Sequence, residues 1–490
     1  MVISDVGTTN NLVQGNFIGV DTSGSRSLAN AFAGVGIYSG AQSNLIGGAT
    51  TQARNFISGN RSYGVQIAGL GSDGNRVQGN FIGTDINGTA AVLNSFAGVG
   101  IYGGAKRNTI GGSTPEARNL ISGHDSYGII IADSGTKNNW VAGNFIGTEL
   151  TGSRSLKNGF AGIGIYAGAQ GNLVGGTATS ARNVISGNNA YGVIIQGQEA
   201  SGNLFQGNFI GTQADGTAAL GNGFNGIGLF GGPSQNIIGL AIDGTGAGNT
   251  VAFNASDGIR LDDTNSVGNT IRGNRIYSNG GLGIELGGPS YFGVTANDAG
   301  DADMGPNQLQ NYPILTSAAA RSATTTITGT FHSAPNRAYI VDIYRGTSPD
   351  PSGHGEGQSY VGTTSLSTDA NGNGSFTMSD SGNFAGQYFS ATATDATTGD
   401  TSEFSSALLA TNAPFSSHFV GPYVRNSSGF TFELYLQTNR AYRLQGTANL
   451  GADPIPWLDL TNFTAPSSPI QFIDRSASNY PARFYRVISP

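Results

Sequence analysis

The sequence predicts an all-β chain: a right-handed parallel β-helix of about ten coils, followed by an immunoglobulin-like β-sandwich and a small C-terminal β module. Three observations support this. One phrase recurs with a strict period of 64 residues, each copy holds short patches in which single branched residues alternate with polar ones, and glycine supplies 79 of 490 residues. Such alternation is typical of strands with one buried face, and abundant glycine suits repeated tight turns.

Each period contains two coils of the predicted β-helix. The phrases NLVQGNFIG, NRVQGNFIG, NWVAGNFIG and NLFQGNFIG begin at Asn11, Asn75, Asn139 and Asn203, and the glycines that open successive coils alternate at spacings of 30 and 34 residues. Three strands of four or five residues cannot fold alone, but stacked coils close a common core. The side chains expected inside are Val35, Ile37, Val65, Ile67, Val77 and Ile82.

Three other recurring sets are predicted to be structural. Asparagines at one turn of successive coils favour an amide ladder, and the arginines of the ARN phrase are expected to bridge turns. Apolar residues on the outside of the third strand need a cover, which we expect from the long connection whose Leu93 and Phe96 recur as Leu156 and Phe160. The three sets are Asn44, Asn75, Asn108, Asn139, Asn172 and Asn203; Arg54, Arg118 and Arg182; and Phe17, Phe56, Phe81, Leu120, Phe145, Val184 and Phe209.

Changes of pattern divide the chain into four parts. Residues 1–288 are expected to form the β-helix, 289–314 an Asp-, Gly- and Pro-rich cap and linker, 315–408 the immunoglobulin-like β-sandwich, and 409–490 the C-terminal β module. Alternating strands at hairpin spacing, such as AYIVDIYRG and GQYFSATATD, predict the sandwich.

Composition excludes several classes of function. A net charge of −7 argues against a nucleic-acid partner, and zero cysteines exclude disulfides, thiol catalysis and Cys-ligated zinc. We expect no membrane span, because no window approaches eighteen apolar residues. No signal peptide is visible, and because Met1 falls inside the repeat pattern we expect the chain to be a fragment. The oligomeric state stays open.

The phrases GNFIGTDINGT, NLIGG and ARNFISGN resemble parallel β-helix repeat proteins of bacterial surfaces and secretions. The ending, with TANL, Trp457 and RFYRV, looks like C-terminal modules of large secreted proteins from the Verrucomicrobia and their relatives. The resemblance implies an extracellular or cell-surface location. It implies no single activity, because that superfamily mixes polysaccharide lyases, hydrolases, epimerases and adhesins, and none of their catalytic motifs matches positions here.

An aromatic stripe is predicted on the first sheet. If Val35 and Ile37 face inward, Tyr38 faces outward, and the same count holds for Tyr102, Tyr166 and Phe230. These rings recur every second coil, about 10 Å apart, near the length of two sugar units in an extended polysaccharide. Aromatic rings stack on sugar faces, so the stripe favours glycan binding. An aromatic ladder that merely shields the sheet, or an interface with another chain, explains it equally well.

A charged cluster is predicted at the end of the same sheet. Arg260 and Asp262 should point outward, with Glu285 beside Arg260 one coil later. The Asp262 and Glu285 carboxylates would lie about 8 Å apart, which fits inverting glycoside hydrolysis. A plain cross-strand ion pair is the alternative, and we favour it.

Two further sets complete the candidates. Asp298, Asp301 and Asp303 lie in the Gly-rich linker, where their oxygens could converge on Ca²⁺, although no known loop template matches. His124 departs from the asparagine of the sister periods, and we expect it to be part of a solvated surface.

The combined interpretation is an extracellular β-helix protein that binds polysaccharide or cell-surface glycan along its first sheet. The alternatives are a polysaccharide lyase or glycoside hydrolase on the same scaffold, and a structural adhesin without a glycan ligand.

Overall fold

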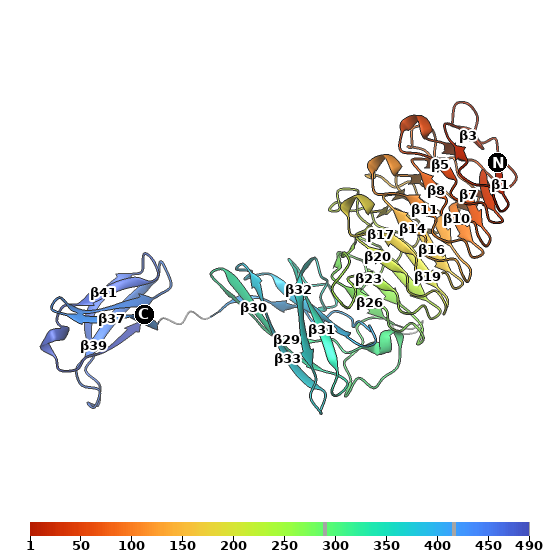
Figure 1. Cartoon of the computed structure of the whole chain (residues 1–490). Coiled ribbons are helices and arrows are strands. Elements are labelled where there is room, and N and C mark those ends of the chain that lie inside the picture. Colours follow the sequence, from red (N-terminus) through yellow and green to blue (C-terminus); the bar gives the residue numbers. More distant parts are fainter. Residues whose placement is uncertain (288–291, 414–417, 490) are drawn as a thin grey trace. The chain divides into compact units, whose positions relative to one another are not determined.

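The computed structural model describes residues 1–287, 292–413 and 418–489, so the predicted boundary at 288/289 lies outside the described residues (Figure 1). The chain divides into two compact units, Met1–Thr411 and Asn412–Pro490. No helix in the described ranges is long and apolar enough to cross a membrane. The helical segments are short 3₁₀ turns: η1 (Thr51–Ala53), η2 (Pro115–Ala117), η3 (Thr179–Ala181), η4 (Pro306–Leu309) and η5 (Ala477–Asn479).

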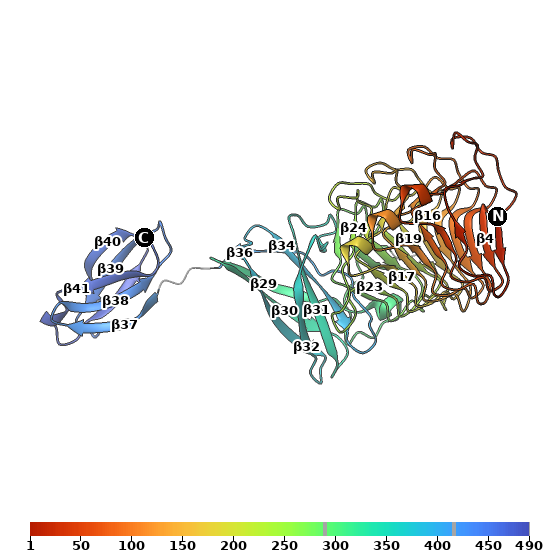
Figure 2. The same cartoon turned by 45° about the horizontal axis from the view of Figure 1, so that its top comes forward.

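The first part of the chain is the predicted parallel β-helix. Its coils stack from the red N-terminal strands to the green β26 in Figure 1, and Figure 2 shows the same stack from a second direction. The first sheet contains ten parallel strands. These are β1 (Val2–Ser4), β4 (Val35–Tyr38), β7 (Tyr63–Ala68), β10 (Ala97–Tyr102), β13 (Tyr127–Ile131), β16 (Ala161–Tyr166), β19 (Val193–Gln196), β22 (Ile227–Phe230), β25 (Ile259–Leu261) and β28 (Ile284–Leu286).

The second and third sheets have nine parallel strands each. The second contains β2 (Leu12–Val13), β5 (Leu45–Gly47), β8 (Arg76–Gln78), β11 (Thr109–Gly111), β14 (Trp140–Ala142), β17 (Leu173–Gly175), β20 (Leu204–Gln206), β23 (Ile237–Gly239) and β26 (Thr270–Arg272). The third contains β3 (Phe17–Ile18), β6 (Phe56–Ile57), β9 (Phe81–Ile82), β12 (Leu120–Ile121), β15 (Phe145–Ile146), β18 (Val184–Ile185), β21 (Phe209–Ile210), β24 (Thr250–Ala252) and β27 (Arg275–Tyr277).

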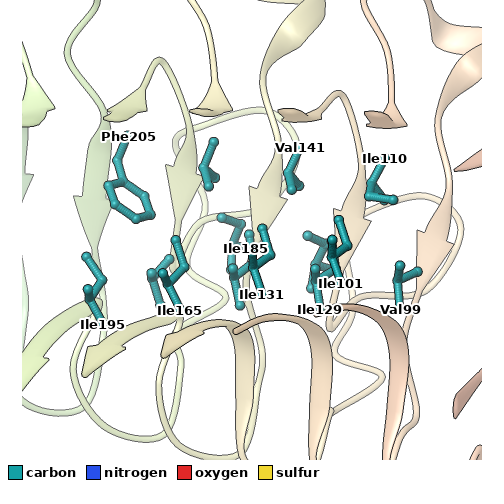
Figure 3. Packing of buried hydrophobic residues seen from close by; sticks show 14 of the residues in the cluster. Val99, Ile101, Ile110, Ile129, Ile131, Val141, Ile165, Ile185, Ile195 and Phe205 are labelled. Atoms are coloured by element: carbon teal, nitrogen blue, oxygen red, sulfur yellow. The ribbon is translucent and has the colours of Figure 1, made fainter. Parts of the chain in front are cut away.

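The interior of the β-helix is a continuous aliphatic column. Figure 3 shows inward side chains of all three sheets gathered in this column, such as Ile131 of the first, Val141 of the second and Ile185 of the third. Burial of each such side chain contributes about 1.5–3 kcal/mol. The predicted inward register is confirmed, since all six residues expected inside are fully buried: Val35, Ile37, Val65, Ile67, Val77 and Ile82.

Asparagine ladders hold the three corners of the coils. In each ladder asparagine side-chain amides donate to the side-chain oxygen one coil further on, as Asn44 does to Asn75 (2.9 Å); His124 interrupts one ladder, where only its backbone N–H donates to Asn158 (3.2 Å). The predicted ladder, which passes through Asn11 and Asn307 at its ends, is confirmed at the corner between the first and second sheets. Two more ladders occupy the other corners: Asn16, Asn55, Asn80, Asn119, Asn144, Asn183, Asn208, Asn249 and Asn274; and Asn30, Asn60, Asn94, His124, Asn158, Asn188, Asn222, Asn254 and Asn279.

Most of the outer face of the third sheet is covered, as predicted, but Phe17 at its N-terminal end is 41% exposed. The turn at Gly88 in the long connection lies directly against Phe81 and Leu120, and both of these side chains are buried. Arg118 bridges turns as expected: its Nε donates to the Gly143 carbonyl (3.1 Å) while its guanidinium lies over the Phe145 ring at 4.1 Å. Arg54 and Arg182 repeat both contacts in their own periods.

One part of that prediction is wrong. Phe96 and Phe160 do not cover the third sheet; they lie at the start of β10 and β16, where they contact Tyr63 and Tyr127 on the first sheet. Leu93 is 43% exposed and does not cover the sheet either. The connection covers the third sheet with its glycine turn and returns to the first sheet before these rings occur.

A β-sandwich follows the β-helix within the same unit. Its sheets run β33-β30-β29-β36 and β32-β31-β34-β35, and antiparallel pairing joins most neighbours. The unit ends at Thr411, so the sandwich extends slightly past the predicted 408. The immunoglobulin-like topology stays a prediction. The strands are β29 (Ile314–Arg321), β30 (Thr324–His332), β31 (Ala338–Gly346), β32 (Ser359–Ser367), β33 (Asn373–Ser381), β34 (Tyr388–Asp395), β35 (Leu408–Leu409) and β36 (Thr411–Asn412).

The sandwich caps the last coil of the β-helix. Arg272 of β26 and Asp342 of β31 form a bidentate pair (2.8 and 3.0 Å) whose side chains are 1% and 0% exposed. Glu403 accepts a hydrogen bond from the Leu286 N–H of β28 (2.9 Å), and Gly357 accepts one from Ile276 of β27 (2.9 Å). These contacts satisfy donors that an open sheet edge would leave unpaired.

The second unit is a small antiparallel module. Its sheets run β37-β38-β41 and β40-β39-β42, and Phe432, Leu434, Tyr442 and Leu444 form the centre of its core. The strands are β37 (His418–Asn426), β38 (Gly429–Tyr435), β39 (Ala441–Thr447), β40 (Leu458–Thr464), β41 (Ile470–Asp474) and β42 (Phe484–Ile488).

Candidate functional site

The four rings of the predicted stripe lie at the ends of alternate strands of the first sheet. Tyr38, Tyr102, Tyr166 and Phe230, which we call the strand-end column, are half-buried on the outer face of β4, β10, β16 and β22. Each ring folds back over the glycine two residues earlier in its own strand, where a Cβ would collide with the ring. Only glycine leaves room for the ring at these positions, so the rings lie along the sheet.

A second column of rings, which sequence reasoning missed, lies at the starts of the strands. Its members are Tyr63, Phe96, Tyr127, Phe160, Tyr191 and Phe224, which we call the strand-start column. Successive centroids are 5.1, 5.8, 5.4, 5.4 and 5.3 Å apart in edge-to-face geometry. A signal was present: tyrosine directly precedes the strand-opening glycine in one coil, and phenylalanine precedes it by two residues in the next.

The two columns contact one another and form one surface, the aromatic tract. Tyr63 contacts Tyr102 (5.5 Å), and Tyr191 contacts Phe230 (5.6 Å). Tyr127 contacts Tyr166 (5.7 Å), and their hydroxyls share a hydrogen bond of 2.9 Å. Burial raises the pKa of Tyr102 and that of Tyr166 well above the ordinary value for tyrosine, so both phenols stay neutral.

The strands beneath the tract carry no ionic group, although the exposed Asp133 directly after β13 accepts a hydrogen bond from the Gly103 N–H (3.1 Å) beside Tyr102. None of the seven described strands from β4 to β22 in the first sheet contains Asp, Glu, Lys, Arg or His. Between the strand-end rings the sheet presents Ala68, Ala132 and Gln196. A firm, uncharged aromatic surface of this kind can stack flat, weakly polar ligands at small desolvation cost.

The predicted cluster of Arg260, Asp262 and Glu285 is brought together, but it is not an open site. Arg260 lies opposite Glu285 in the strand register, as predicted. The side chains are only 4% (Arg260) and 2% (Glu285) exposed, which corrects the expectation that they point into solvent. Phe292 lies over the Arg260 guanidinium, 4.4 Å from its centre.

Arg260 has different ionic partners from the predicted one. Its contacts are to Asp262 (3.0 Å) and Asp257 (3.5 Å). Glu285 instead accepts a hydrogen bond from the Gly293 N–H (2.9 Å), and its other oxygen is buried without a partner. Burial raises the pKa of Glu285 to about 7. This arrangement favours the structural interpretation of the cluster, because Glu285 is buried and only Asp262 of the two carboxylates is partly exposed.

The predicted metal ligands Asp298, Asp301 and Asp303 do converge, with one oxygen of each within 4.8 Å of the others. Asp301 accepts hydrogen bonds from the Asn311 N–H (2.9 Å) and the Ser333 hydroxyl (2.5 Å). One buried oxygen of Asp298 and one of Asp303 have no hydrogen-bond partner. Burial, with the neighbouring carboxylates adding to it, raises the pKa of Asp301 to about 6.

The acidic cluster borders a cavity of about 610 Å³. Asp301 and Asp303 line it from the linker, Gln235 from the β-helix, and Arg337 and Asp395 from the sandwich. Arg337 and Asp395 are paired (2.8 Å), so the negative charge of the cavity comes from the linker carboxylates and from Asp400, which also lines it. Carboxylate oxygens at this spacing suit a hard cation such as Ca²⁺.

His124 is not part of a solvated surface, contrary to expectation. It replaces an asparagine of the third ladder, is 2% exposed, and has no hydrogen-bond partner for either ring nitrogen. Its ring packs against Gly83 and Gly98. Burial lowers the pKa of His124 to about 3, so the imidazole is neutral.

Comparison with known proteins adds no functional information: no protein-family model matches the chain, and no curated protein matches it.

Proposed function

We propose that this protein is extracellular or exposed at a cell surface, and that it binds polysaccharide or cell-surface glycan along the aromatic tract of its first sheet. The observation that carries the proposal is the tract itself: two columns of rings, half-buried, uncharged and in mutual contact. Such rings keep one side packed on the protein and leave surface for the apolar faces of sugars.

The confinement of the strand-end rings also explains why glycan binding would cost little conformational entropy. The strand-end rings are confined by their glycines and by ring neighbours, so little side-chain entropy remains to be lost when a ligand binds. The scaffold under them is a stack of hydrogen-bonded strands that presents the rings at a fixed spacing.

The test is a glycan array followed by titration with the glycans that bind. Tyr166→Ala should weaken binding roughly threefold to tenfold, as expected for the loss of one stacked ring. Trp140→Ala is the matched control, because Trp140 is an equally half-buried outward ring on the second sheet. Equal losses in both variants, or no glycan bound by the wild-type protein, would contradict the proposal.

The enzyme alternative is less well supported. Arg260 and Glu285 are buried, and Phe292 covers the guanidinium. A structural adhesin remains the competing class, and it predicts that the rings only shield the sheet. In that case Tyr166→Ala lowers the melting temperature and the array shows no ligand.

We also propose that Asp298, Asp301 and Asp303 hold a Ca²⁺ ion that stabilises the linker. Two buried, unpartnered carboxylate oxygens in one cluster support this, since a cation would satisfy both. Added Ca²⁺ should raise the melting temperature and protect the linker from proteolysis, and Asp303→Asn should abolish both effects. Asp21→Asn, which changes an exposed turn of the β-helix, is the control. Unchanged melting with Ca²⁺ and with chelator would leave the linker as an acidic turn.

A further inference from the structure

We propose that the ligand is an uncharged polysaccharide whose extended chain runs along the β-helix axis, with one ring of the strand-end column beneath every second sugar. This inference rests on the proposed function and specifies the class of glycan and its direction on the protein.

The direction follows from the strand register. Tyr38 lies opposite Ala68, and Ala68 lies opposite Tyr102, so the column crosses the strands at right angles and runs along the stack. Gln196 is likewise opposite both Tyr166 and Phe230. Neighbouring parallel strands are about 4.8 Å apart, which places equivalent rings about 10 Å apart. That spacing matches two sugar units of an extended chain, so a linear polymer meets one ring per disaccharide.

The profile of the tract also favours a linear polymer. Strands that end in a ring alternate with strands whose equivalent position is Ala68 (β7), Ala132 directly after β13, or Gln196 (β19). Ala132 is buried beside Tyr102 and Tyr166 in one apolar cluster. At the strand ends, the alternation gives an aromatic ring followed by a non-aromatic side chain, and this pattern repeats with the same two-coil period as the sequence.

The absence of charge selects against polyanions. No ionic residue occurs in the described strands β4 to β22, so nothing on the tract would neutralise a uronate or a sulfate. Burying an unpaired carboxylate against apolar rings is costly, and the net charge of −7 repels an anionic polymer at longer range. Along the strands of the first sheet, the first ionic side chain after Phe230 is Arg260 of β25, which is buried and paired with Asp257 and Asp262. A neutral, linear glycan therefore fits this surface best.

The spacing defines the length of chain that the tract can use. The strand-end column has four rings and three intervals of about 10 Å, so about eight sugars would engage every ring. Shorter oligomers should bind progressively more weakly in steps of two sugars, since one ring is lost per disaccharide.

The experiment measures affinity against chain length for the full chain. The probes are neutral cello-, xylo-, manno- and chito-oligosaccharides of two to eight sugars, and oligogalacturonates of the same lengths. At least one neutral series should gain roughly threefold to tenfold per added disaccharide, level off at about eight sugars, and change little with salt. In Gly164→Ala the added Cβ should displace the Tyr166 ring. The affinity gain that one added disaccharide gives the wild-type protein should then be lost.

The outcomes separate the two proposals. If oligogalacturonates bind and the neutral series do not, or if affinity rises without a two-sugar step, this inference is overturned and glycan binding by the tract stands. If no oligosaccharide or polymer binds a sample with unchanged melting behaviour, both proposals fail. Trp140→Ala again serves as the control. If this variant also lost the affinity gain for one added disaccharide, the effect would not come from the tract.

Discussion

The first and third sheets of the β-helix both carry a column of large apolar side chains on their outer faces, but only one column is covered. Phe81, Leu120, Phe145 and Val184 on the third sheet are buried under the long connections and the guanidinium groups of Arg54 and Arg118. The rings of the aromatic tract have no such cover and stay half-buried. A recurring aromatic residue therefore does not indicate a ligand by itself; the indication comes from what covers it.

The largest expected effect is a loss of stability in the third sheet without a loss of glycan binding. Phe145→Ala removes a ring that is 6% exposed, and it should lower the free energy of unfolding by about 3–5 kcal/mol while leaving glycan affinity unchanged. Tyr166→Ala should lower stability much less and reduce affinity. Chemical denaturation and glycan titration of both variants measure the difference. Similar stability losses would show that the two columns are equivalent core elements.

His124 lies at the corner where the third sheet leads into the first, and its replacement tests how far both sheets depend on the ladder. The folded-state pKa of His124 is about 3, below the ordinary value of 6.5, so the folded protein binds fewer protons than the unfolded chain between these values. Its stability contribution is complete above pH 6.5 and falls by a few kcal/mol as the pH drops towards 3.

His124→Asn should remove that loss, because it restores the amide found in the sister coils. It should also add about 1–3 kcal/mol at neutral pH, since it removes two buried nitrogens that have no partner. The measurement is the melting temperature of both proteins between pH 4 and 7, taken as a difference so that other titrating groups cancel. A constant difference across this range would contradict the assignment of the pH dependence to His124.

Most of the β-helix could be predicted from the sequence because the 64-residue period, through its four copies, fixes the register of the coils within them. Ile37 and Ile67 face inward and Tyr38 faces outward, as alternation requires. The positions of Phe96 and His124 could not be read in the same way, because both lie in turns where alternation does not apply. Whether a turn residue points inward depends on the corner geometry of the stacked coils.

The candidate sites show a similar limit. Register places Arg260 opposite Glu285, and that part of the prediction is confirmed. The cover over Arg260 comes from Phe292, which follows the last strand of the β-helix, and Glu403 of the later sandwich caps the same strand at Leu286; both lie outside the repeat. The alternation of apolar and polar residues within one coil does not show which of its outward side chains a later segment of the chain will bury. The same holds for the strand-start column, which becomes visible only when rings from alternate coils are placed side by side.

A smaller effect is expected from the cover of the third sheet. Arg118→Met keeps the length of the side chain but removes the guanidinium over Phe145 and the hydrogen bond to the Gly143 carbonyl, which should cost about 1–2 kcal/mol. Arg321→Met, at the exposed end of β29, is the control. Denaturation curves measure both variants. Glycan affinity should not respond, and an affinity loss would place the third sheet in the binding surface.

The smallest expected effect distinguishes the ring of Tyr166 from its hydroxyl. Tyr166→Phe removes the hydrogen bond to Tyr127 (2.9 Å), which should lower stability by about 0.5–1.5 kcal/mol. Phe230 occupies the equivalent place on β22 without a hydroxyl, so stacking there requires only the ring. Tyr166→Phe should therefore reduce glycan affinity less than Tyr166→Ala does. An equal affinity loss in the two variants would mean that the hydroxyl, rather than the ring face, contacts the sugar, and the tract would then act as a row of hydrogen-bonding positions instead of a stacking surface.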